Sequence, residues 1–140
     1  MPNFDMLGKM HRIHIPVSAA NATDGKLNAA FNGVGYAYAC ESMNIDKILL
    51  SFAMSAGVNA AGSGSTKIGV YVNNTAIHSA TFEVGYASSA PYAVLDRASL
   101  TTKAIAEGDV IRIDLLAVPG GAATSYAQSA MVTVVGQSVG

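Results

Sequence analysis

The sequence predicts an all-β protein built as an antiparallel β-sandwich. Short apolar segments alternate with period two along most of the chain, which is typical of half-buried strands. Turn signals rich in Gly, Asn, Asp and Pro separate these segments at roughly regular spacing, and no long amphipathic helical pattern interrupts them. The chain has 140 residues, enough for one domain. We expect residues 1–10 to form a short N-terminal arm and residues 11–140 to form a single sandwich domain.

Three strands are expected in the first part of the chain. The first covers residues 11–17, and Pro16 either places it at a sheet edge or ends it, because proline has no N–H to donate to a neighbour. After a turn-rich stretch, Val34, Tyr36 and Tyr38 indicate a short strand through a glycine-rich region. Residues 48–54 form a strong period-two face, and a flexible Gly/Ser loop follows it.

The second part of the chain repeats this pattern of strands and turns. Asn73 and Asn74 tolerate positive φ, so they are expected to turn one strand back into the next. Residues 101–106 can hold a helical turn, and the Gly-Asp turn at residues 107–109 precedes the clearest strand of all. The strands expected here cover residues 67–72, 82–84, 92–100, 111–117 and 131–135.

The core is predicted from the alternation itself, because a register slip of one residue would turn each apolar set to solvent. Arg112 and Asp114 lie on the opposite face of the clearest strand, where they can pair with each other or reach across to a neighbouring strand or subunit. The expected core residues are Ile13, Ile15, Ile48, Leu50, Phe52, Ile68, Val70, Val72, Ile111, Ile113 and Leu115.

The composition narrows the classes of partner. Charged residues make up 12% of the chain, about half of the ~25% usual in soluble domains, and the formal net charge is −1. The eight basic residues are scattered singly, so we expect no nucleic-acid binding. No segment is apolar enough to span a membrane, and the first residues do not read as a signal peptide, so we expect synthesis in a host cytoplasm.

No pattern of catalytic, cofactor or metal-binding residues emerges. Cys40 is the single cysteine, which rules out an intrachain disulfide. His11 and His14 are three residues apart, so on a strand they point to opposite faces and share no metal site. Glu107 and Asp109 flank a glycine before a strand, and we interpret them as turn residues whose Asp side chain bonds local N–H groups.

Four segments together carry a resemblance to a known family. They are the strand ILLSFAMSAG with its Gly/Ser loop, the strand-and-turn unit KIGVYVNNTAI, the strand AEGDVIRIDLLAV and the closing strand AMVTVV. Their order resembles the small jelly-roll virion proteins of tailed bacteriophages, which include capsid decoration (cement) proteins and related modules of fibres and baseplates. The resemblance covers roughly residues 45–136 and implies a sandwich of the jelly-roll type. The Gly-Asp turn before an alternating strand also occurs in C1q-like and tumour-necrosis-factor-like trimers.

The resemblance implies a structural role without enzymatic activity. We expect a capsid decoration protein on the virion surface that binds the major capsid protein, stabilises contacts between its subunits and forms a homo-oligomer, with a trimer favoured. The alternative is a fibre or baseplate module that binds host surface glycans through exposed loops at residues 21–32, 58–66 and 119–126. The six tyrosines can form a modest carbohydrate surface, although tyrosine in a half-buried sheet is the commoner explanation. A secreted C1q-like ligand is a third interpretation, and the missing signal peptide opposes it.

The N-terminal arm contains the residues predicted to make a partner contact. It lacks strand or helix periodicity but carries four large apolar side chains: Phe4, Met6, Leu7 and Met10. These side chains can be buried against the capsid or a sister subunit, and the alternative is that they pack on the chain's own sandwich.

Overall fold

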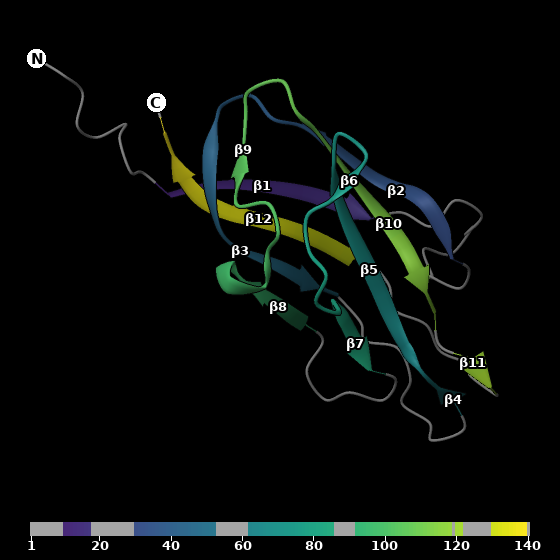
Figure 1. The fold of residues 1–140 in the computed structure, drawn as a ribbon. Coiled ribbons are helices and arrows are strands. Elements are labelled where there is room, and N and C mark those ends of the chain that lie inside the picture. The colour runs from purple at the N-terminus through teal and green to yellow at the C-terminus, as the bar shows by residue number, and fades with distance from the viewer. Residues whose placement is uncertain are drawn as a thin grey trace, which may run out of the picture.

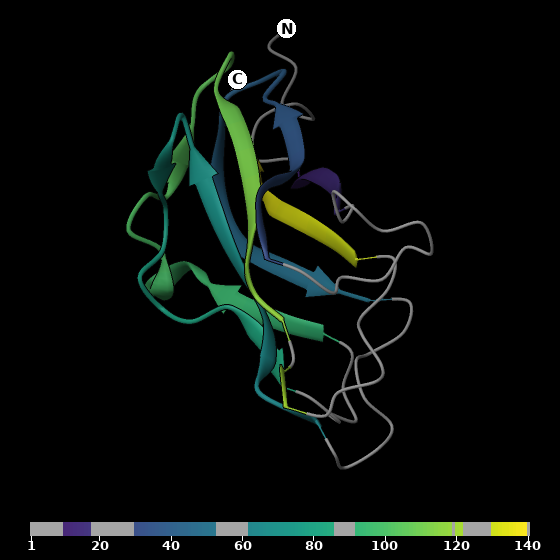
Figure 2. The ribbon, with the colours of Figure 1, turned by 90° about the vertical axis from the view of Figure 1, so that its right-hand side faces the viewer.

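The computed structural model describes residues 10–17, 30–52, 62–85, 92–118, 120–121 and 130–139. These residues form an antiparallel β-sandwich, so the predicted all-β sandwich is confirmed. The strands of one sheet run across Figure 1, and those of the other run obliquely down it. Figure 2 shows the two sheets as facing layers.

The first sheet has the strand order β1-β12-β3-β8, and the short strand β9 pairs with one end of β3. All of its pairings are antiparallel. Its strands are β1 (Met10–Val17), β12 (Ala130–Ser138), β3 (Met43–Ser51), β8 (Tyr92–Asp96) and β9 (Ala104–Ile105).

The second sheet has the order β2-β10-β5-β6, and β7 pairs with β5 beside β6. Its strands are β2 (Phe31–Tyr38), β10 (Val110–Ala117), β5 (Ser65–Val72), β6 (Thr75–Ala76) and β7 (Glu83–Gly85). A small third sheet joins β4 (Gly62–Ser63) to β11 (Gly120–Gly121). The chain passes back and forth between the two main sheets, and this strand order is that of a two-sheet jelly roll.

The core lies between the two sheets, where the inward side chains of facing strands meet. Ten of the eleven predicted core residues are buried. Ile13 is only half-buried, although it packs against the core. β1 is an edge strand whose single neighbour in the sheet is β12, so less protein covers Ile13 than covers residues of the central strands.

The predicted turn at Asn73 and Asn74 is confirmed. Their φ angles are 49° and 68°, both in the left-handed region that a two-residue hairpin of this type requires. The turn reverses β5 into β6, which pairs Val72 with Thr75 directly across it.

The helical turn predicted for residues 101–106 is wrong. The described helical segment is instead the short 3₁₀ helix η1 (Arg97–Ser99), and the chain then becomes extended in β9. The Arg97 guanidinium donates to the carbonyls of Ile45 and Lys103, and the Ile45 N–H donates to the same Lys103 carbonyl at 2.8 Å. These bonds hold the chain alongside β3, which leaves no room for a helical turn there.

The strand expected around Val34, Tyr36 and Tyr38 is confirmed, but its regular alternation is not. Val34 and Gly35 are both buried, whereas Tyr36 and Tyr38 are exposed on the outer face. The register of β2 against β10 shifts in this region, which is why a strict period of two fails.

A glycine at the bulge between β12 and β3 yields a direct test of the packing. A Cβ on Gly136 would overlap the carbonyl oxygen of Asn44 and lie 2.6 Å from Cε of Met43. We predict that Gly136→Ala lowers the free energy of unfolding by about 3 kcal/mol, the upper range for overpacking, because a backbone atom cannot move aside easily. Urea denaturation followed by circular dichroism measures this loss.

Gly85 in β7 is the matched control, since a Cβ there meets no atom of the described residues within 4 Å. Gly85→Ala should change the free energy of unfolding by less than about 0.5 kcal/mol. Equal effects of the two substitutions would contradict the packing described at Gly136.

Candidate functional site

A buried ion pair lies on the outer face of β10, at the middle of the second sheet. Nε of Arg112 donates to Oδ1 of Asp114 at 2.9 Å, and Nη2 donates to Oδ2 at 3.1 Å. The Asp114 side chain is 3% exposed and that of Arg112 is 23% exposed. The predicted pairing of these two residues is therefore confirmed in its direct form, as a two-point contact that fixes the guanidinium plane.

Asp114 also holds the irregular part of β2. Ile113 pairs with Gly35 and Leu115 pairs with Phe31, so extra residues of β2 lie opposite Asp114. Within that bulge Gly33 has φ 76°, and its N–H donates to Oδ1 of Asp114 at 2.8 Å. The carboxylate thus replaces the ladder partner that the bulge removes from Gly33.

The Arg112 guanidinium reaches two further residues of neighbouring segments. Nη1 donates to Oδ1 of Asn74 at 2.7 Å, and the guanidinium carbon lies 4.6 Å from the centre of the Tyr71 ring. Arg112 is directly opposite Tyr36 on β2 and Tyr71 on β5. The side chain is therefore held from several sides before any ligand arrives.

Asp109 anchors the turn next to this ion pair. Its Oδ2 accepts from the Ala106 N–H at 2.9 Å, which confirms the predicted turn chemistry. Its Oδ1 accepts from Nδ2 of Asn73 at 2.8 Å, and Oδ1 of Asn73 accepts from the Val110 N–H at 3.0 Å. The turn before β10 and the turn after β5 are thereby locked together.

Two tyrosine side chains pass close to glycines on this outer face. A Cβ on Gly33 would overlap the Tyr36 hydroxyl and approach its ring carbons to 3.1 and 3.2 Å. A Cβ on Gly69 would lie 2.9 Å from a ring carbon of Tyr71. The glycines thus leave room for the rings to lie against the sheet. Sequence reasoning missed this arrangement, although a glycine two positions before Tyr71, on the same strand face, was a readable signal.

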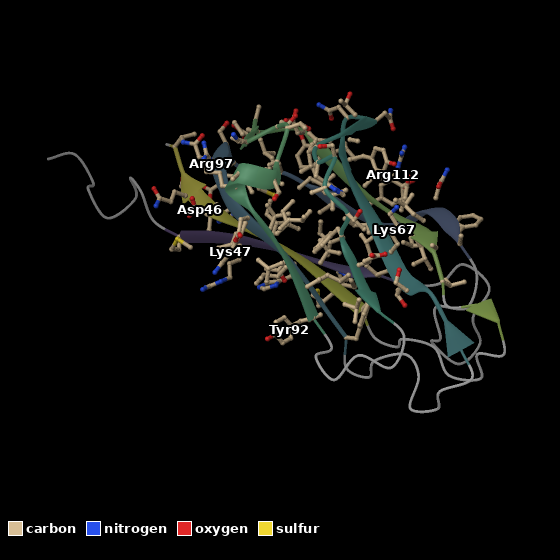
Figure 3. The ribbon with its side chains drawn as sticks, turned by 60° about the horizontal axis from the view of Figure 1, so that its bottom comes forward. Asp46, Lys47, Lys67, Tyr92, Arg97 and Arg112 are labelled. Atoms are coloured by element: carbon tan, nitrogen blue, oxygen red, sulfur yellow. The ribbon has the colours of Figure 1, made fainter. Side chains whose placement is uncertain are left out.

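Tyr36, Arg112 and the turn after β5 enclose a surface hollow of about 290 Å³. Its lining residues are Tyr36, Asn73, Asn74, Val110 and Arg112. Figure 3 shows Arg112 over the second sheet, far from Asp46, Lys47 and Arg97, which gather around β3 and η1. Aromatic surface, a guanidinium and side-chain amides therefore converge on one concave place, which is the usual pattern of a small-molecule site.

The three histidines are separate from this hollow and from one another. Nδ1 of His11 lies 2.8 Å from Oε1 of Glu41, and Nδ1 of His14 lies 3.1 Å from the Thr133 hydroxyl. His78 bridges backbone groups in the second sheet, since its Nε2 accepts from the Val70 N–H at 3.1 Å while Nδ1 lies 2.8 Å from the Ala80 carbonyl.

Two further features are absent from the described ranges. Within them, no group of three His, Cys, Asp or Glu side chains is placed to hold a metal ion. The same ranges contain no helix with the length and apolarity needed to cross a bilayer.

The predicted contact residues of the arm fall mostly outside the described part of the chain. Phe4, Met6 and Leu7 lie outside the described residues, so their contact with a capsid or a subunit stays a prediction. Met10 begins β1 opposite Gln137, at the edge of the first sheet, and is 50% exposed.

Comparison with known proteins bears on the fold of the chain. No protein-family model and no curated protein matches the chain. Among solved structures, it is similar to a chain from the capsid of Ralstonia phage GP4, with a TM-score of 0.56 and 10% sequence identity. The match covers 100% of this chain and 90% of that one. At this identity the likeness shows a shared fold.

The contribution of the Arg112–Asp114 ion pair to the stability of the sheet can be tested by substitution. We predict that Arg112→Met lowers the free energy of unfolding by roughly 2–3 kcal/mol, because it leaves the buried Asp114 carboxylate without its cation. The expected loss is below that of a fully buried pair because Arg112 is 23% exposed. Urea denaturation measures it.

The double variant Arg112→Met/Asp114→Leu should recover part of this stability, since it removes both charges. Lys103→Met, which removes an exposed cation, is the control and should change stability by less than about 0.5 kcal/mol. A loss no larger for Arg112→Met than for Lys103→Met would show that the ion pair does not stabilise the sheet.

Proposed function

We propose that this chain is a structural protein of a bacteriophage virion, and specifically a capsid decoration (cement) protein. In this role it binds the outer capsid surface and stabilises contacts between major capsid protein subunits. The observation that carries the proposal is the fold that the chain shares, over its full length, with a chain from a phage capsid. The two chains are also similar in length, because the alignment covers nearly all of both.

The outer face of the first sheet is the surface we assign to the capsid. A row of cross-strand neighbours there runs from His14 through Thr133 and Leu49 to Val94. Val94 is 44% exposed at the end of this row, beside the half-buried Leu49. The neighbouring row of this face carries three exposed charged residues, Arg12, Lys47 and Asp96, around Val135. In such a contact Val94 and Leu49 would supply the apolar part and these charges the polar part. The predicted contact arm joins the same sheet at Met10, so arm and sheet can form one continuous contact.

The stabilising mechanism follows from interface area. A subunit that contacts two neighbouring capsid proteins adds an interface that must be broken before the shell opens. Stable interfaces bury about 800 Å² on each partner, and binding to the closed shell alone shifts the equilibrium towards it.

A homotrimer would multiply these contacts around a three-fold axis, and sedimentation equilibrium of the isolated chain measures that oligomeric state. The role requires no catalysis, and we propose that the chain is not an enzyme.

The function is tested with particles that lack the chain. Purified protein added to such particles should sediment with them and raise the temperature at which they release their genome. Absence of binding, or binding without any gain in heat or osmotic resistance, would overturn the decoration role.

A pair of substitutions tests which face binds. We predict that Val94→Lys weakens particle binding at least about tenfold, because it places a charge in the contact. Leu116→Lys is the matched control, since Leu116 is 40% exposed on the outer face of the other sheet. Binding should survive that change, and the opposite result would assign the capsid contact to the second sheet.

The arm is tested by deletion of residues 1–10. If the arm docks on the capsid, the deletion abolishes particle binding and leaves the melting temperature of the isolated protein unchanged. A lower melting temperature with retained binding would show instead that the apolar side chains Phe4, Met6, Leu7 and Met10 pack on the chain's own sandwich.

A further inference from the structure

The hollow on the second sheet has an exposed aromatic side chain in its lining. Tyr36 is 62% exposed, and the hydroxyl end of its ring lies against Gly33, so much of the side chain is open to solvent. Tyr38 is 64% exposed two pairs further along β2, opposite Val110. A ring that is held against the sheet at its hydroxyl end loses little entropy when a second flat surface stacks on it.

Polar groups at the rim of the hollow still have bonding capacity. Arg112 uses three of its five N–H groups on Asp114 and Asn74, which leaves two N–H groups without a partner among the described residues. Asn74 accepts through its Oδ1, and no bond from its Nδ2 amide occurs within the described ranges. These donors are held in place next to the Tyr36 ring rather than swinging freely.

The charge balance of the hollow disfavours an anion. The Asp114 carboxylate neutralises the Arg112 guanidinium, with 2.9 Å between Oδ1 and Nε. A second carboxylate, that of Asp109, accepts through Oδ1 from Nδ2 of Asn73 at 2.8 Å. Lys67, the other cation of the second sheet's outer face, lies at the far end of β5, opposite Ala117. A phosphate or sulfate would meet more negative than unpaired positive charge here, so a neutral, hydroxyl-rich ligand is favoured.

We propose that this hollow binds one pyranose ring of a neutral glycan. A pyranose presents a face of C–H bonds, which fits the exposed Tyr36 ring, and a rim of hydroxyls that accept from Asn74 and Arg112. The volume of about 290 Å³ lies just below the range of roughly 300–1,000 Å³ for small-molecule sites, which suits a single ring. The hollow and the capsid surface assigned to Val94 lie on outer faces of different sheets, so both can be occupied at once. The inference does not depend on capsid attachment.

The test uses the isolated protein. A glycan array carrying neutral and anionic oligosaccharides identifies a binder, and NMR titration with neutral methyl hexopyranosides then measures affinity. A single ring is expected to bind with Kd on the order of 1 mM, given the modest affinity per atom of such ligands. The perturbed signals should include the side-chain amide of Asn74 and Nε–H of Arg112.

Two variants and a control make the result specific. Tyr36→Leu keeps an apolar cover over Gly33 but removes the flat ring, and Asn74→Gly keeps the positive φ of 68° but removes the amide. Each should weaken binding at least about tenfold. Tyr92→Leu is the control, because Tyr92 is 61% exposed on β8 of the first sheet and points away from Arg112 (Figure 3).

Three results of the glycan experiments would overturn the proposal. They are the absence of binding to any neutral glycan, binding restricted to anionic probes, and binding that survives both Tyr36→Leu and Asn74→Gly. A loss of particle binding in Tyr36→Leu without any sugar binding would assign the hollow to a protein contact instead. Because the glycan assay contains no particles, its failure leaves the decoration test unaffected.

Discussion

The buried carboxylate of Asp114 organises the outer face of the second sheet. It holds Arg112 through two bonds and Gly33 through a third, so it joins the irregular edge strand β2 to the central strand β10. Through Arg112 it also reaches Asn74 in the turn after β5. Burying a charge is costly unless every bond is satisfied, so this part of the sheet has few alternative arrangements. Rigidity here is what turns exposed tyrosines into a defined surface.

The two faces of β10 have different roles, one in folding and one in the proposed recognition. Its inward residues Ile111, Ile113 and Leu115 are buried in the core and specify the register of the sheet. Its outward residues, Arg112 and Asp114, carry the polar network that shapes the hollow. The first sheet repeats this division, with core residues inward and the row ending at Val94 outward. A sandwich of this kind can therefore present two independent surfaces without compromising its core.

The sequence was sufficient to predict the buried face of strands whose alternation is regular and that have a neighbouring strand on both sides. The inward residues of β3, β5 and β10 are examples, and the Asn73-Asn74 turn follows from the φ angles that Asn tolerates. The sequence did not predict the backbone where tertiary contacts override the local pattern. Examples are the bulge at Gly33 and the extended segment held by Arg97. The Arg112–Asp114 pair was visible as two charges on one strand face. Its burial and its bond to Gly33 were not, because they depend on a strand 81 residues away.

Electron cryo-microscopy of virus particles with and without the chain tests whether this sandwich is a capsid component, as we propose. We expect difference density on the outer surface of the shell, into which the two-sheet fold fits with the first sheet towards the capsid. Density confined to a tail, fibre or baseplate would contradict this proposal, as would particles whose maps are identical.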